Sequence, residues 1–72
     1  MHTEEMIRKV GSELRKIRVQ NHLTLDELAE KTGVSKLTLG KIERGETNPT
    51  LGVMWKITTG LNIPLTKLVS VE

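Results

Sequence analysis

The fold of this chain is decided by one stretch, residues 25–45, which reads LDELAEKTGVSKLTLGKIERG. Thr24 stands directly before it and Glu27 follows three positions later, and this spacing is typical of a capping box, in which each side chain bonds the other residue's backbone N–H. Gly33 supplies the left-handed residue that ends such a helix. The first half of the stretch therefore predicts a helix that ends near Thr32.

A second helix is predicted after a turn of three or four residues. Ser35 is its capping residue, and it runs to Arg44, directly before Gly45. Two short helices can cross at a steep angle through so short a turn if small residues allow it, and Ala29 is small where the following helix approaches. The shared apolar contact falls to Leu28, Val34, Leu39 and Ile42. The pattern predicts a helix-turn-helix. An ordinary helical hairpin is the alternative, because it explains the same glycine and leucines.

The second helix has a basic outward face. At about 100° per residue, one arc collects Lys36, Leu37, Gly40, Lys41 and Arg44. This arc holds no carboxylate, which would repel a duplex. Residues 36–44 are therefore predicted to be a recognition helix in the major groove, where Lys36 and Lys41 donate to guanine and Leu37 packs on a thymine methyl group. Arg44, at the helix end, suits a phosphate. The alternative is that these charges are merely solvated.

Two helix starts add candidate phosphate contacts. Unpaired backbone N–H groups and the positive end of the helix dipole allow a helix N-terminus to bind anions. The residues concerned are Thr24 and Leu25 at one start, and Asn48 and Thr50 at the other. We expect them to contact the DNA backbone on either side of the recognition helix.

Upstream, residues from about 3 to 21 have helical periodicity. The apolar positions are Ile7, Val10, Leu14 and Ile17. Arg18 projects within about 40° of Leu14 and so belongs to the buried stripe, where a guanidinium without a partner is costly. Glu43 borders the inner face of the recognition helix, and we predict that it pairs with Arg18 and holds that helix against the first one. The alternative makes Arg18 a phosphate ligand.

Downstream, residues 48–50 predict a loop and a new helix start, since proline suits a first turn and Thr50 can cap. The inward positions of this helix are Leu51, Met54, Ile57 and Leu61, and Asn62 is the expected left-handed stop. Pro64 begins a short fifth helix that contains Leu65 and Leu68. Trp55 is predicted to pack at the edge of the core rather than to contact a partner. No strand pattern is present, so the fold class is all-α, a compact bundle of five helices.

Composition excludes several classes of protein. The chain has no cysteine, and His2 and His22 match no zinc spacing, so neither a disulfide nor a metal site is expected. There is no nucleophile–base pairing and no phosphate-binding loop, so we expect no cofactor and no enzymatic activity. No apolar run is long enough to span a membrane. We expect one cytoplasmic, nucleoid-associated domain over residues 1–72, and the net charge of +2 hints at an anionic partner.

The stretch from Leu25 to Leu51 resembles the XRE-type family of phage-repressor-like (Cro-like) helix-turn-helix regulators. The matching motifs are Leu28-Ala29, Thr32-Gly33-Val34-Ser35, Ile42-Glu43-Arg44-Gly45 and Asn48-Pro49-Thr50-Leu51. Flanking positions extend the resemblance over residues 11–69, the core of the domain. It implies a five-helix, lambda-repressor-like domain that binds operator DNA, usually as a dimer on a near-palindromic site, and acts as a repressor.

The resemblance also implies roles for single residues. The base-facing positions of the family fall on Ser35, Lys36, Leu37 and Lys41, and Gly40 on the same face is also expected to face the bases. Arg18 and Glu43 correspond to a structural ion pair. Gly40 stands where the family has a longer side chain, and Leu25 stands where a polar residue often meets a phosphate. Family members that resemble the segment NPTLGVMWKI often continue into a separate sensor domain, commonly a cupin barrel.

Two classes of function remain. The first is regulation by a homodimer on double-stranded DNA. The candidate dimer surface is Ile63, Leu65, Val69 and Val71, although these residues can equally complete the domain's own core. The second is a protein-interaction module, such as an antitoxin or a coactivator-like domain, because one fold supports many functions. Salt dependence discriminates between them, since only the DNA complex weakens steeply as counterions are released.

Overall fold

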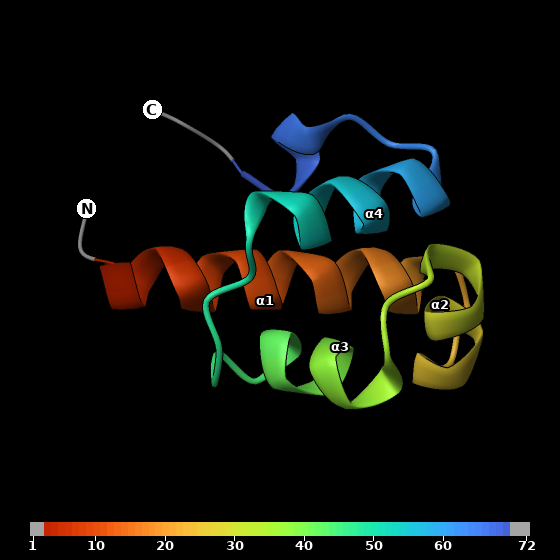
Figure 1. Cartoon of the computed structure of the whole chain (residues 1–72), viewed down its shortest axis with the longest axis horizontal. Helices are drawn as coiled ribbons and strands as arrows, with labels where there is room; N and C mark the ends of the chain where they lie inside the picture. Colours follow the sequence, from red (N-terminus) through yellow and green to blue (C-terminus); the bar gives the residue numbers. More distant parts are fainter. Residues whose placement is uncertain (1–2, 70–72) are drawn as a thin grey trace.

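The computed structural model describes residues 3–69 as a bundle of four α-helices. Their bounds are α1 (Thr3–Gln20), α2 (Leu25–Thr32), α3 (Lys36–Glu43) and α4 (Leu51–Leu61), followed by a single 3-10 turn, η1 (Leu65–Lys67). In Figure 1, α1 runs through the middle, with α3 on one side of it and α4 on the other, and α2 stands at one end. The described residues contain no strand. The all-α prediction is therefore confirmed.

The prediction of a fifth α-helix is wrong. The segment after Pro64 makes one turn of three residues, and no side chain caps its start. Lys67 N–H donates to the Pro64 carbonyl and Leu68 N–H to the Leu65 carbonyl, each at 3.0 Å, and Val69 N–H also donates to the Leu65 carbonyl. Helix nucleation is unfavourable, so a segment this short gains too few hydrogen bonds to form an α-helix. Burial of Leu68 holds the turn in place instead.

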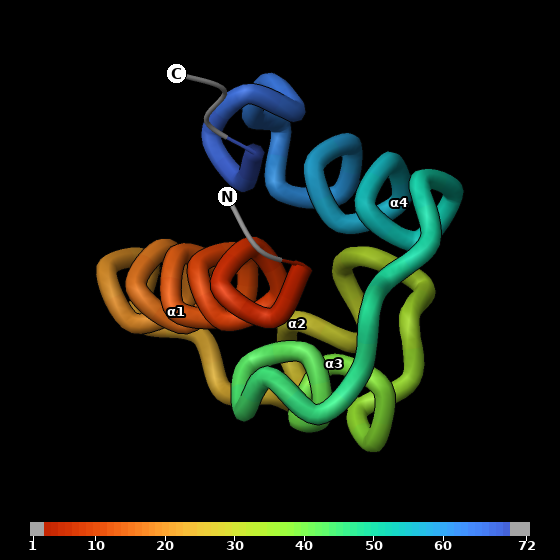
Figure 2. Tube along the Cα trace, turned by 90° about the vertical axis from the view of Figure 1, so that its left-hand side faces the viewer, coloured from red at the N-terminus to blue at the C-terminus, as the bar shows by residue number. Residues whose placement is uncertain are grey.

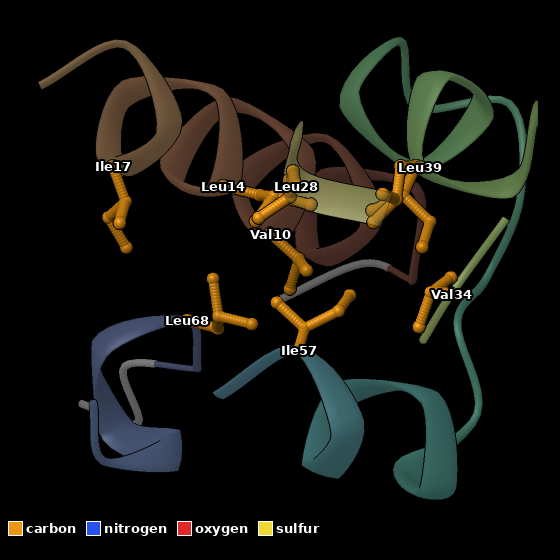
Figure 3. Packing of buried hydrophobic residues seen from close by; sticks show 9 residues of the cluster. Val10, Leu14, Ile17, Leu28, Val34, Leu39, Ile57 and Leu68 are labelled. Atoms are coloured by element: carbon orange, nitrogen blue, oxygen red, sulfur yellow. The ribbon is translucent and has the colours of Figure 1, made fainter. Parts of the chain in front are cut away.

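The core lies between all four helices and the η1 turn. Its members are Val10, Leu14, Ile17, Leu28, Val34, Leu39, Ile42, Ile57 and Leu68. Figure 3 shows Leu14 and Leu28 at the centre of the cluster, with Ile57 and Leu68 pointing toward them from the opposite side. Burying apolar surface is the dominant favourable term in folding. These contacts therefore determine how α3 is presented to its surroundings.

Two predictions for α4 are wrong. Leu51 was expected to point inward but is 65% exposed, and Trp55 was expected to pack at the edge of the core but is 64% exposed. At about 100° per residue, Leu51 and Trp55 project about 120° and 160° away from Ile57, the buried apolar residue of the helix. Met54 and Leu61 do pack against the core. The outer face of α4 thus carries two large apolar side chains that were expected to pack on the core.

The end of α4 lies unusually close to α2. A Cβ atom at Gly60 would lie 2.6 Å from the Lys31 carbonyl oxygen and 2.8 Å from the Thr32 Cα atom. The neighbouring Thr58 is buried, and its hydroxyl donates to the Met54 carbonyl at 3.0 Å. The low helix propensity of this segment therefore accompanies a close helix crossing that a side chain at position 60 would prevent.

Local capping agrees with the sequence. Thr24 N–H donates to the Glu27 carboxylate at 2.9 Å, and Glu27 N–H donates to the Thr24 hydroxyl at 3.1 Å. Gly33 and Asn62 end α2 and α4 with φ of 75° and 57°, the left-handed region. The capping box and both left-handed stops are confirmed.

The capping box makes stability depend on pH. The hydrogen bond from the Thr24 backbone N–H lowers the pKa of Glu27 below its usual 4.5. A lowered folded-state pKa contributes stability that is present above the unfolded value and is lost as the pH falls through the folded one. The melting temperature of wild type should therefore exceed that of Glu27→Gln by a constant difference from about pH 5 upward. This difference should shrink at lower pH. Thermal melts between pH 3 and 7 measure this, and a margin independent of pH would contradict it.

Candidate nucleic-acid interface

The outward face of α3 and the start of α2 form a shallow hollow. It has a volume of about 270 Å³ and is lined by Leu25, Lys36, Leu37, Gly40 and Arg44. Figure 2 shows α3 on one side of the molecule, with α4 and the C-terminal turn on the other. The structure therefore brings together five residues that the sequence analysis assigned to bases or phosphates.

Lys36, Leu37 and Arg44 are the exposed residues of this face. Leu37 is 68% exposed, although it is a large apolar residue. Lys36 Nζ lies 3.2 Å from a carboxylate oxygen of Asp26 on α2, and both side chains are mostly exposed. Exposed pairs of this kind contribute little, so an incoming phosphate or base can replace Asp26 as the partner of Lys36.

Gly40 lies on the outward arc, as the sequence analysis expected, but a neighbouring side chain covers it. It is buried, and a Cβ atom added to it would lie 2.9 Å from Arg44 Nη1. Arg44 Nε in turn donates to Glu46 at 2.5 Å. This hydrogen bond raises the pKa of Arg44 and lowers that of Glu46. In the free chain the Arg44 guanidinium therefore covers Gly40, because the glycine leaves room for it.

The hydroxyls at the helix starts are occupied by their own helices. The Ser35 hydroxyl accepts from Thr38 N–H at 3.1 Å, and Thr24 bonds Glu27 as described above. Thr50 accepts from Val53 N–H at 3.1 Å and so caps α4. Each hydroxyl bonds one backbone N–H group in the first turn of its helix, so the other N–H groups of that turn remain available to an anion.

The other predicted contacts lie apart from the hollow on α3. Asn48 lines a different hollow, beside Met6 and Met54. Figure 2 shows the start of α4, which Thr50 caps, at the far end of the loop that leaves α3. Lys41 is exposed on α3, but it does not line the hollow.

Arg18 and Glu43 form the ion pair expected from helix periodicity. Arg18 Nε lies 2.7 Å from Glu43 Oε2, and Arg18 Nη2 donates to Glu43 Oε1 at 3.0 Å. Arg18 Nη1 donates to the Leu23 carbonyl at 2.9 Å. The hydrogen bond to Glu43 raises the pKa of Arg18. One guanidinium thus joins α1, the loop before α2 and the end of α3, so its donors point inward rather than toward a phosphate.

Three features of the site were missed from the sequence. Asp26 and Glu46 hold Lys36 and Arg44, and Gly11 lies so close to α3 that an added Cβ atom would overlap the Ile42 carbonyl oxygen. The spacing of Arg44 and Glu46, two residues apart, could have indicated one pair. The other two features depend on how separate helices meet.

Within residues 3–69, no group of three or more His, Cys, Asp and Glu side chains could bind a metal ion. No helix in that part of the chain is long and apolar enough to cross a membrane. The geometry of α2 and α3, with a turn at Gly33 and an uncovered basic face on α3, defines a helix-turn-helix domain.

Comparison with known proteins agrees. A family model described as helix-turn-helix matches residues 14–68, so the chain belongs to this family. The chain is 46% identical over 67 residues to the HTH-type transcriptional regulator SutR of Escherichia coli K12, covering 93% of this chain and 38% of SutR. The alternative of an ordinary helical hairpin is thereby excluded.

Solved structures give the same result. A helix-turn-helix family transcriptional regulator from Vibrio cholerae superposes with a TM-score of 0.88 at 38% identity, covering 90% of this chain and 36% of that one. The restriction-modification controller protein C.AhdI from Aeromonas hydrophila superposes with a TM-score of 0.82 at 32% identity, covering 86% of this chain and 94% of that one. The chain thus spans less than two fifths of SutR and of the Vibrio regulator, and these relatives are regulators rather than enzymes.

Proposed function

We propose that this chain binds double-stranded DNA sequence-specifically and regulates transcription, with α3 in the major groove. One observation carries the proposal. The single carboxylate of α3, on Glu43, is bound inward by Arg18, so the outer face of the helix presents Lys36, Leu37 and Lys41. A face that combines long cations with an exposed apolar side chain suits base edges and thymine methyl groups.

The roles of the other residues follow from this docking. Lys36 and Lys41 donate to guanine, and Leu37 packs on a thymine methyl group. Ser35 lies at the N-terminal end of α3, which enters the groove. Gly40 has no side chain and so lets the backbone of α3 approach the DNA. The Arg44 guanidinium leaves Glu46 and binds a phosphate instead. The remaining phosphate contacts are Thr24 and Leu25 at the start of α2 and Asn48 and Thr50 before α4.

We infer that two copies bind a near-palindromic operator. One recognition helix of eight residues reaches few bases, and a second half-site about one helical turn away doubles the contacts. Occupation of the operator excludes other proteins from it, which makes repression the inferred direction of regulation.

Selection of bound duplexes from a random pool tests the function. A consensus with dyad symmetry is the expected result, and its affinity should fall steeply with salt. Recovery of no enriched sequence, together with a protein complex that is indifferent to salt, would instead favour the protein-interaction module.

Removal of Lys41 should weaken recognition without affecting the fold. Lys41→Ala is expected to lower the affinity for the consensus by about 1–3 kcal/mol, or about 5- to 150-fold, and to relax one base position. Fluorescence anisotropy at fixed salt measures this. Lys9→Ala, at an exposed position of α1, is the matched control, because it removes the same charge from another helix. Equal losses of affinity in both variants would show that the effect comes from net charge rather than from a base contact.

A further inference from the structure

One ion pair joins the start of α2 to the start of α3. Lys36, the first residue of α3, places its Nζ atom 3.2 Å from Oδ2 of Asp26, the second residue of α2. The two side chains are 59% and 74% exposed. Exposed pairs of this kind contribute little to stability, so stability alone does not explain why these two groups lie together.

The pair lies at the edge of the face that is proposed to bind DNA. Lys36 lines the hollow on the outer face of α3, and so does Leu25, the residue before Asp26. In helix-turn-helix domains the first residues of the recognition helix contact base edges. A carboxylate in this place repels phosphates, so the pair suits the bases better than the DNA backbone.

A lysine and a carboxylate held together present a hydrogen-bond donor and an acceptor side by side. The ammonium group of Lys36 has three N–H donors, and the carboxylate of Asp26 accepts through two oxygens. Each group can therefore keep its partner and bind a base as well. A base then joins Asp26 at Lys36 rather than replacing it.

A G·C base pair offers the complementary pattern in the major groove. Guanine presents two acceptors, N7 and O6, and cytosine presents the N4 amino donor. O6 and N4 hydrogen-bond each other and so lie about 2.9 Å apart. This separation is close to the 3.2 Å between Lys36 Nζ and Asp26 Oδ2. An A·T pair fits less well, because adenine offers only N7 beside its N6 donor and the ammonium group loses one acceptor.

We propose that Lys36 and Asp26 read one G·C base pair as a unit. Lys36 donates to guanine, and Asp26 accepts from the N4 amino group of the cytosine that pairs with it. The inference rests on the proposed function, because it assigns a base pair to the DNA that the helix-turn-helix binds. Asp26 is then a specificity-determining residue that lies on α2, outside the recognition helix.

One copy of the chain is sufficient for this contact. Each half-site of an operator therefore contains one such base pair. The contact does not depend on the dimer residues expected from the sequence, of which Ile63 and Val69 pack against the core and Val71 lies outside the described residues.

Selection of bound duplexes by Asp26→Ala tests the role of the carboxylate. Alanine has no acceptor, so the preference for G·C should fall about tenfold at one position of the consensus. Affinity for duplexes that lack this G·C pair should rise, because a charge that repels phosphates is gone. The capping box of Thr24 and Glu27 is untouched, so α2 should remain folded.

Two further variants complete this selection. Glu30→Ala, one turn further along α2, removes the same charge from an exposed position and is the matched control. It should leave the consensus unchanged. Lys36→Ala should relax the same base position as Asp26→Ala, because the two side chains act on one base pair. Relaxation of two different positions would contradict reading as a unit.

The outcomes separate this inference from the proposed function. A consensus that is the same for Asp26→Ala and wild type would overturn the inference and leave DNA binding standing. An A·T pair at the position that changes would overturn the assignment to G·C. If wild type enriches no sequence at all, the proposed function fails and the base assignment fails with it.

Modified cytosines examine the single hydrogen bond to Asp26. N4-methylcytosine still pairs with guanine but lacks the N–H that points into the major groove. At the assigned position it should weaken binding by wild type about tenfold and change binding by Asp26→Ala little. 5-Methylcytosine keeps the amino donor and adds a methyl group nearby, so it is the matched control. Equal losses in both proteins would show that shape excludes the modified base and that Asp26 does not accept from cytosine.

Discussion

Replacement of Glu43 by alanine is expected to lower the free energy of unfolding by about 3 kcal/mol. The change leaves the Arg18 guanidinium without its carboxylate, in a place where the two side chains are only 15% and 6% exposed. Removing one partner of a buried pair costs about 3–5 kcal/mol, and the residual exposure of Arg18 puts the expected loss at the lower end. In a domain of this size such a loss lowers the melting temperature by about 12–24 °C.

Thermal melts with two further variants isolate the cause. Glu46→Ala breaks the exposed pair with Arg44 and should leave the melting temperature close to that of wild type, because exposed pairs contribute little. Arg18→Met combined with Glu43→Leu removes both charges and should recover much of the loss, since a buried pair can often be replaced by apolar residues. If Glu43→Ala had the same melting temperature as wild type, the pair would not hold α3 against α1.

The features predicted correctly from the sequence are local or follow from a local conflict. The capping box at Thr24 and Glu27 and the left-handed stop at Asn62 each involve residues within one turn. Arg18 was assigned a partner because a cation in an apolar stripe requires one. Glu43 was chosen because it is the carboxylate at the border of the inner face of α3. Such inferences need no knowledge of how the helices cross.

The incorrect predictions concern positions where the sequence is ambiguous. Helix α4 has apolar residues on every side, so periodicity alone did not show that Leu51 and Trp55 are exposed. Gly40 was placed on the outward arc correctly, but its burial depends on the side-chain conformation of Arg44. The segment after Pro64 has helix-like spacing but lacks the length to form an α-helix.

The second large effect is expected from the smallest possible change, Gly11→Ala. Glycine in the middle of a helix usually costs stability relative to alanine, so this substitution would ordinarily stabilise α1 by about 0.5–1 kcal/mol. Here the added methyl group would overlap the Ile42 carbonyl oxygen and would lie 3.1 Å from the Glu43 carbonyl oxygen. Both are backbone atoms that cannot rotate away, so α3 must move as a unit.

We therefore expect Gly11→Ala to destabilise the domain by about 3 kcal/mol, at the upper end of the range for overpacking. Gly52→Ala on α4 is the matched control. Its nearest neighbour would be the Thr50 hydroxyl oxygen at 3.9 Å, so the same substitution should stabilise the domain by about 0.5–1 kcal/mol. Urea unfolding of both variants measures the two free energies, which should have opposite signs.

The same pair of variants connects packing to DNA recognition. Displacement of α3 also displaces Lys36 and Leu37 relative to the start of α2, across the hollow that they line together. Gly11→Ala should therefore lose affinity for the selected duplex even at temperatures where it remains folded, whereas Gly52→Ala should bind one half-site as wild type does. If Gly11→Ala were as stable as Gly52→Ala, α1 and α3 would have to lie further apart than the close crossing at Gly11, and the placement of the recognition helix would need revision.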